Sequence, residues 1–248
     1  MAEPANASVV AASVPLAAAP AVGVDGKLVF GLTRGHLIGL LAIVAVVQIP
    51  FIVYGLRGAA PATAQVPFTD DFNRPSLGEN WWSTGGAWRL DNGVVHSPGV
   101  KNNPLWLKAR LPDDVAVEFD ARSESADGDL KCEIFGNGYD HASGYVVIMG
   151  GWSNTSSIIA RLDEHGPTVG QPHNRYDRVE TKTLKVEKGK TYRFRLERKG
   201  NLLRWFVDNQ LALQYDDPNP LKGSGHDRFG FSSWDSDLFF DNLSIQAL

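Results

Sequence analysis

The chain has 248 residues, with 24 Lys and Arg against 28 Asp and Glu, and a formal net charge of −4. A slightly acidic chain offers no basic surface to neutralise phosphates, so the composition predicts no nucleic-acid partner. The single cysteine, Cys132, excludes an intramolecular disulfide framework and any zinc site built from several cysteines.

The N-terminal residues 1–33 are rich in Ala, Val and Pro and show no helical period, which predicts a disordered tail. An uncharged apolar segment follows, because no Asp, Glu, Lys or Arg occurs between Arg34 and Arg57. About 20 apolar residues, at roughly 1.5 Å each, are needed to cross the ~30 Å hydrocarbon core of a bilayer. The sequence therefore predicts a transmembrane helix over 34–57, with residues 37–56 in contact with lipid.

The charges on either side of this segment predict its orientation. Lys27 and Arg34 precede the apolar residues, whereas Arg57 alone follows them, which favours a cytoplasmic N-terminus and an extracytoplasmic C-terminal domain, periplasmic or on the cell surface in a bacterium. The sequence 62–64, Ala-Thr-Ala, resembles a signal-peptidase site. However, the apolar run exceeds the 7–15 residues typical of signal peptides, so a retained signal anchor is the favoured interpretation and a cleaved signal the alternative.

Residues 58–66 form a predicted Ala/Pro linker, and 67–248 form one predicted domain with an almost entirely β pattern. Apolar and polar residues alternate over 115–120 and 191–197, as in strands with one buried face. The remaining predicted strands are 105–111, 130–135, 144–149, 157–162, 184–187, 202–207, 211–215, 229–232 and 238–245. Many short strands separated by Gly, Asn and Asp turns predict an all-β sandwich or barrel.

Several segments of this domain resemble one known superfamily in their order and spacing. They are FTDDFNRP at 68–75, the Trp pair at 81–82, GAWRLDNG at 86–93, VEFDAR at 117–122, VDNQ at 207–210 and the C-terminal residues 228–245. Together they resemble the concanavalin A-like lectin/glucanase superfamily, in particular its bacterial laminin-G-like and 3-keto-disaccharide hydrolase-like branches. The resemblance implies a jelly-roll sandwich of two antiparallel sheets, often with a carbohydrate site on the concave face. It does not imply catalysis, since fold and function are separable.

Glycoside hydrolysis is one chemistry that the resemblance raises. Glucanases of glycoside hydrolase family 16 carry a Glu-x-Asp-x-(x)-Glu strand, and Glu118 and Asp120 match its first two acids. Arg122 and Ser123 occupy the places of the third acid, so the set is incomplete. We expect Glu118 and Asp120 to be catalytic only if the protein is an enzyme, and otherwise to belong to a charged row on a solvated sheet face.

Carbohydrate binding without catalysis is the favoured function. Sugars are held by stacking on aromatic rings, framed by polar groups that donate and accept hydrogen bonds. Trp152 is the main candidate, because it follows two glycines and precedes two polar residues. The other expected binding residues are Trp106, Tyr139, His141, Asn154, Arg161 and Trp234.

Calcium is the one cofactor that the resemblance suggests, since related domains often bind Ca²⁺ at the first and last strands. By that resemblance Asp71 and Asp241 are the expected ligands, and turn-forming roles are the alternative. The sequence thus predicts a membrane-anchored module that binds glycan or envelope material. Two alternatives stay open, a keto-disaccharide hydrolase-like enzyme and a structural module that binds a membrane protein partner.

Overall fold

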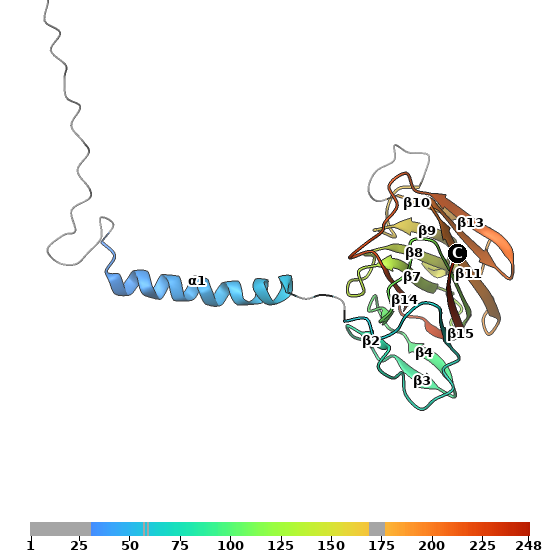
Figure 1. Ribbon diagram of the computed structural model, residues 1–248, viewed down its shortest axis with the longest axis horizontal. Coiled ribbons are helices and arrows are strands. Elements are labelled where there is room, and N and C mark those ends of the chain that lie inside the picture. Colours follow the sequence, from blue (N-terminus) through green and yellow to red (C-terminus); the bar gives the residue numbers. More distant parts are fainter. Residues whose placement is uncertain (1–30, 57, 59, 169–176) are drawn as a thin grey trace, which may run out of the picture. The chain divides into compact units, whose positions relative to one another are not determined.

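The computed structural model describes residues 31–56, 58, 60–168 and 177–248 (Figure 1). The chain divides into two compact units, Met1–Arg57 and Gly58–Leu248. The first contains the predicted helix, which is present as α1 (Arg34–Gly55). By length and composition, α1 is able to cross a membrane. The predicted disordered tail lies almost entirely outside the described residues.

The second unit is an all-β domain of two antiparallel sheets, as predicted. The eight-stranded sheet has the order β13-β12-β11-β6-β15-β4-β3, with β1 also paired to β15. Its strands are β1 (Phe68–Asp70), β3 (Arg89–Asp91), β4 (Val94–Pro98), β6 (Val115–Ser123), β11 (Thr191–Lys199), β12 (Leu202–Val207), β13 (Gln210–Asp216) and β15 (Asp237–Ala247).

The seven-stranded sheet has the order β10-β9-β8-β7-β14-β5-β2, and Figure 1 shows β10 to β14 side by side in that order. Its strands are β2 (Trp81–Ser83), β5 (Leu105–Leu107), β7 (Leu130–Gly136), β8 (Tyr145–Gly150), β9 (Ser156–Arg161), β10 (Arg178–Thr181) and β14 (Arg228–Ser232). A short turn, α2 (Gly151–Asn154), joins β8 to β9.

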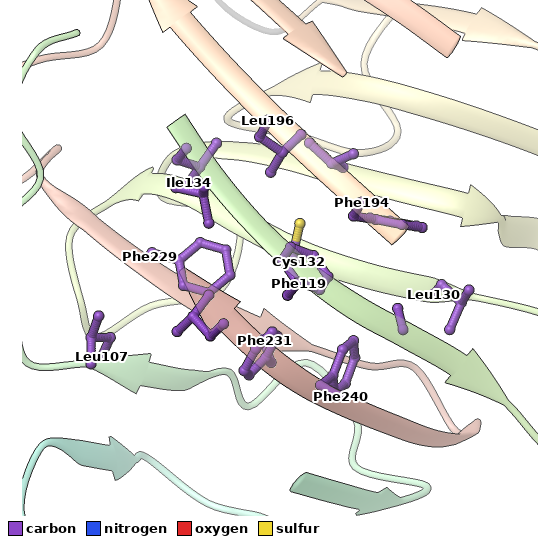
Figure 2. Close-up of a cluster of buried hydrophobic side chains, with 14 of the residues drawn as sticks. Leu107, Phe119, Leu130, Cys132, Ile134, Phe194, Leu196, Phe229, Phe231 and Phe240 are labelled. Atoms are coloured by element: carbon purple, nitrogen blue, oxygen red, sulfur yellow. The ribbon is translucent and has the colours of Figure 1, made fainter. Parts of the chain in front are cut away.

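The core lies between the sheets and is rich in phenylalanine (Figure 2). Phe119 of β6 contacts Phe229 and Phe231 of β14 across the two layers, with ring centroids 5.7 and 5.2 Å apart. Cys132 of β7 is fully buried among these rings, so the lone cysteine is a core residue. Burial of this apolar surface is the main force that holds the two sheets together.

The predicted strand at 184–187 is wrong, and its backbone groups find other partners. Asn154 replaces a neighbouring strand: its side-chain oxygen accepts from Val186 N–H at 2.8 Å and its amide donates to Val186 O at 2.7 Å. The strand that pairs with β9 is instead β10, before this segment. The predicted strand at 105–111 is also shorter, since β5 ends at Leu107.

The end of the predicted linker 58–66 is hydrogen-bonded to the domain. The backbone N–H groups of Thr63 and Ala64 both donate to Lys108 O, at 2.9 and 3.1 Å. These contacts belong to the second unit, which begins at Gly58 by its contacts. Thr63 and Ala64 are therefore joined to the domain through its backbone.

Candidate functional site

A pocket of about 460 Å³ opens over the outer face of the seven-stranded sheet. Lys131 and Ile148 lie opposite each other on β7 and β8, and both line the pocket. Their neighbours Cys132 and Val147 point into the core, so Lys131 and Ile148 point away from it. The other lining residues are Asn102, Asp127, Asp129, Trp152, Ser153, Glu164, His165, Trp234, Asp235 and Ser236.

Trp152 stands on a left-handed turn at one wall of the pocket. Its φ is 49°, and those of Ser153 and Asn154 are 55° and 60°. Left-handed backbone costs an ordinary residue roughly 1–2 kcal/mol, so three such residues in succession require outside support. The indole is 39% exposed, whereas most large aromatic side chains of the domain are buried. The turn thus holds a large apolar ring at the surface, beside the pocket.

Asn154 supplies that support through its contacts with Val186. The backbone carbonyl of Asn154 also accepts from Lys185 Nζ at 2.6 Å, and Thr155 Oγ1 donates to Trp152 O at 2.7 Å. Because both ends of the Asn154 amide are occupied, we assign this residue to positioning Trp152. The sequence had suggested that it contacts the ligand itself.

Trp234 also lines the pocket, lies in the β14–β15 connection and is 53% exposed. Its backbone N–H donates to Asp129 Oδ2 at 2.8 Å. The ammonium of Lys101 lies 5.9 Å from the Trp234 ring, and the guanidinium of Arg178 lies 5.2 Å from the Trp152 ring. Each tryptophan is therefore held by a hydrogen bond to its backbone and by a cation–π contact with its ring.

Beneath the pocket lies a chain of buried charged side chains. Glu133 is completely buried, and its carboxylate accepts from His141 Nδ1 at 2.6 Å. His141 Nε2 lies 3.5 Å from Glu164, whose carboxylate lies 3.1 Å from Lys131 Nζ. Lys131 also donates to Asn102 Oδ1 at 3.3 Å. Two carboxylates and two cations thus alternate, so that each buried charge has a counterion.

The pKa values of His141 and Glu164 follow from their ion pairs. Burial alone would lower the pKa of His141, but hydrogen bonds to Glu133 and Glu164 raise it to about 9. Burial opposes ionisation of Glu164 too, yet His141 and Lys131 lower its pKa to about 2. At neutral pH His141 and Glu164 are therefore both ionised.

Asp129 differs, because burial dominates and raises its pKa to about 6. Lys131 and the Trp234 N–H stabilise the ionised form only in part. Asp129 is the carboxylate of the pocket wall whose charge is least compensated.

No family model matches the sequence, and no curated protein matches it either. Solved structures do match the fold. The carbohydrate binding module CBM66 from Bacillus subtilis superimposes with a TM-score of 0.54 at 14% identity, over 68% of this chain and 96% of that one. The carbohydrate recognition domain of Emp47p gives 0.52 at 16% identity, over 73% and 96%. A sialidase gives 0.53 at 12% identity, over 76% of this chain and 19% of that one. The domain has a concanavalin A-like jelly-roll fold.

The jelly roll places three of the expected binding residues away from the pocket wall. Trp106 is completely buried, and its ring packs on the bare backbone of Gly136 and Gly230, so no ring face is left for a ligand. Tyr139 lies beside Trp82, with ring centroids 5.7 Å apart. Arg161 Nε donates to Asp217 Oδ2 at 2.8 Å. His141 lies close beneath the pocket but is occupied by its two carboxylate partners.

Glu118 and Asp120 lie on β6, in the other sheet of the jelly roll. Arg193 contacts both, with nitrogen–oxygen distances of 3.2 Å to each carboxylate. Arg195 lies 3.7 Å from Glu118, and Asn242 donates to Asp120 Oδ2 at 2.8 Å. Glu118 and Asp120 thus belong to a charged, half-exposed row, and neither lines the pocket described above.

The expected calcium ligands lie at the β1–β15 side of the jelly roll. Asp71 Oδ1 accepts from Asn73 N–H at 3.2 Å, and Asp241 Oδ1 accepts from Asn242 N–H at 2.7 Å. Burial raises the pKa of Asp241, and the charges of Asp120 and Asp71 raise it further. Within the described ranges, no three His, Cys, Asp or Glu side chains are arranged to hold a metal ion. Calcium binding here remains a prediction from the resemblance.

The sequence did not single out the charged residues of the site. Asp129, Lys131, Glu133 and Glu164 carry its electrostatics, and none was expected there. One signal was available: Lys131 and Glu133 alternate with apolar residues on a strand that is buried on both faces. Buried charges on a strand indicate a covering layer with partners of opposite charge.

Proposed function

We propose that this jelly roll binds carbohydrate in the pocket that Trp152 and Trp234 line and does not cleave it. The observation that carries the proposal is that two exposed indoles line one pocket together with carboxylates and an amide. Its volume falls within the ~300–1,000 Å³ of typical small-ligand sites.

The chemistry of this wall suits a sugar. A pyranose presents an apolar face that stacks on an aromatic ring, and hydroxyl groups at its edge that need hydrogen-bond partners. Trp152 and Trp234 provide rings, while Asp129 and Asn102 provide carboxylate and amide groups in the same pocket. Ile148 provides an apolar floor. The fold of known carbohydrate-binding domains supports the same conclusion, although at 14–16% identity it shows the architecture alone.

The proposal includes α1 as the membrane anchor of the binding domain. Its apolar stretch Arg34–Val53 has 20 residues, enough for about 30 Å of hydrocarbon. The charges beside it favour a domain outside the cytoplasm, where envelope polysaccharides are found. A cleaved signal sequence is the alternative for the same helix, and it would export the domain as well.

Replacing Trp152 or Trp234 by alanine is expected to weaken glycan binding by about 10- to 100-fold, as for aromatic residues at the centre of an interface. Binding of the full chain in detergent is first screened on a polysaccharide panel and then measured by calorimetry. Leu211→Ala is the matched control, since Leu211 is 52% exposed on the other sheet. An affinity that stays unchanged in both tryptophan variants would show that the glycan binds elsewhere.

The non-catalytic part of the proposal is supported by the missing third acid of the strand and by the pairing of Glu118 and Asp120 with Arg193. Release of reducing ends from a bound oligosaccharide, abolished by Glu118→Gln or Asp120→Asn, would establish the enzyme instead. Recovery of a stoichiometric membrane protein together with the chain, without glycan binding, would establish the structural module.

A further inference from the structure

The most unusual group of the pocket is the carboxylate of Asp129, which precedes β7. Its residue is only 8% exposed, yet it lines the pocket. Oδ2 accepts the Trp234 N–H at 2.8 Å, whereas Oδ1 has no hydrogen bond within the described part of the chain. No cationic side chain of the described residues lies within 4 Å of this carboxylate. A nearly buried anion thus faces the pocket with one oxygen unpartnered.

The other charges of the wall are compensated or solvated. Glu164 and Lys131 are paired at 3.1 Å, and Asp235 lies 3.0 Å from Lys101. Asp127 and His165 are exposed to solvent. Asp129 is therefore the group with the most to gain from a donor that a ligand brings.

The charges of the pocket wall restrict the chemical class of that ligand. Four carboxylates line the pocket, those of Asp127, Asp129, Glu164 and Asp235, and Lys131 is the one Lys or Arg among the described lining residues. Lys131 is 1% exposed and its charge is already taken by Glu164, so it offers little to a ligand anion. Uronic acids, sulfated sugars and phosphates are disfavoured here, whereas a ligand cation is favoured.

A metal ion is the simplest cation, but the described carboxylates are not grouped to hold one. An organic ammonium needs only one carboxylate oxygen and a nearby apolar ring, and the pocket provides both. We propose, on the basis of the carbohydrate site argued above, that the pocket selects sugars with a free amino group, whose ammonium donates to Asp129 Oδ1. Such a ligand stacks its ring on an indole and supplies the missing counterion.

Burial raises the pKa of Asp129 to about 6, which measures the cost of its ionised form in the empty pocket. An ammonium in contact would offset this cost. An N-acetylated amine has no charge and is bulkier, so it gains less. A hydroxyl group at the same position also donates a hydrogen bond, but charge-assisted bonds are roughly twice as strong.

The test compares three tetrasaccharides by calorimetry at pH 7, on the full chain in phosphatidylcholine nanodiscs. They are fully deacetylated chitotetraose, its N-acetylated parent and uncharged cellotetraose. We expect the free amine to bind at least about tenfold tighter than either of the others. Asp129→Asn keeps the acceptor for Trp234 N–H and is expected to remove the preference. Asp216→Asn, on exposed β13, removes the same charge far from the pocket and is expected to keep it.

Equal affinity for the three ligands in the unmodified chain would overturn the inference without any variant. So would a preference for the amine that survives Asp129→Asn in a variant that unfolds at the normal temperature. If the ligands bind equally and Trp152→Ala removes all binding, the carbohydrate site stands and the selectivity is wrong. If no glycan binds, the proposed function fails as well.

Discussion

Replacing Glu133 by glutamine is expected to lower the free energy of unfolding by about 3 kcal/mol or more. Glu133 is completely buried and accepts from His141 Nδ1 at 2.6 Å and from Ala142 N–H at 2.8 Å. The glutamine amide is neutral, so the His141 imidazolium loses its nearest counterion. Its NH2 group also replaces one of the two oxygens that accept from His141 Nδ1 and Ala142 N–H, so two donors then face each other. Removal of one partner from a buried ion pair typically costs about 3–5 kcal/mol.

Urea unfolding of the full chain, followed by tryptophan fluorescence, measures this loss. Glu118→Gln is the matched control, because its carboxylate is also in an ion pair, with Arg193, but is 34% exposed. Half-exposed pairs contribute about 1 kcal/mol or less, so the control is expected to stay close to the unmodified protein. Equal losses in the two variants would contradict the buried chain of charges described above.

Raising the pH from about 6 to about 10 is expected to destabilise the domain, because His141 loses its proton. Its pKa is about 9 in the folded protein and 6.5 as the ordinary value. A raised pKa means that the stabilisation is present in full below about 6.5 and is lost as the pH rises through 9. The difference corresponds to roughly 3 kcal/mol.

The measurement is the free energy of unfolding against pH for the unmodified chain and for His141→Gln. Lysines and tyrosines also titrate at alkaline pH, but they do so in both proteins, so the difference between the two curves isolates His141. This difference is expected to shrink between pH 6.5 and 9. Parallel curves over that range would show that His141 is not held in its charged form by Glu133 and Glu164.

The fold could be predicted where side-chain alternation is regular. In β6, Val117, Phe119 and Ala121 alternate with Glu118, Asp120 and Arg122, and the strand is found where it was expected. The three-residue strands β1, β2 and β3 are too short to show a period, so the sequence did not reveal them. The segment 184–187 has an apolar pattern, but its hydrogen bonds come from the Asn154 side chain, which no local pattern records.

The site was predicted in part, because composition identifies candidate residues but not their exposure. Trp152 and Trp234 were both named, and they lie on the same pocket although 82 positions separate them. Trp106 has the same side chain as Trp152, but its ring is buried against Gly136 and Gly230. The ion pairs of Glu164 with Lys131 and His141 join residues far apart in the sequence, so these partners could not be matched before the fold was known.

A sugar bound in the pocket that Trp152 and Trp234 line would change the surroundings of both indoles. The most direct test is the indole N–H region of an NMR spectrum, in which the chain's seven tryptophans each give one signal. The signals are assigned by single Trp→Phe variants, and a glycan that binds is then titrated. We expect the Trp152 and Trp234 signals to shift together and saturably, while those of the buried Trp106 and Trp205 stay in place. Saturable binding that leaves both Trp152 and Trp234 unshifted would contradict the account.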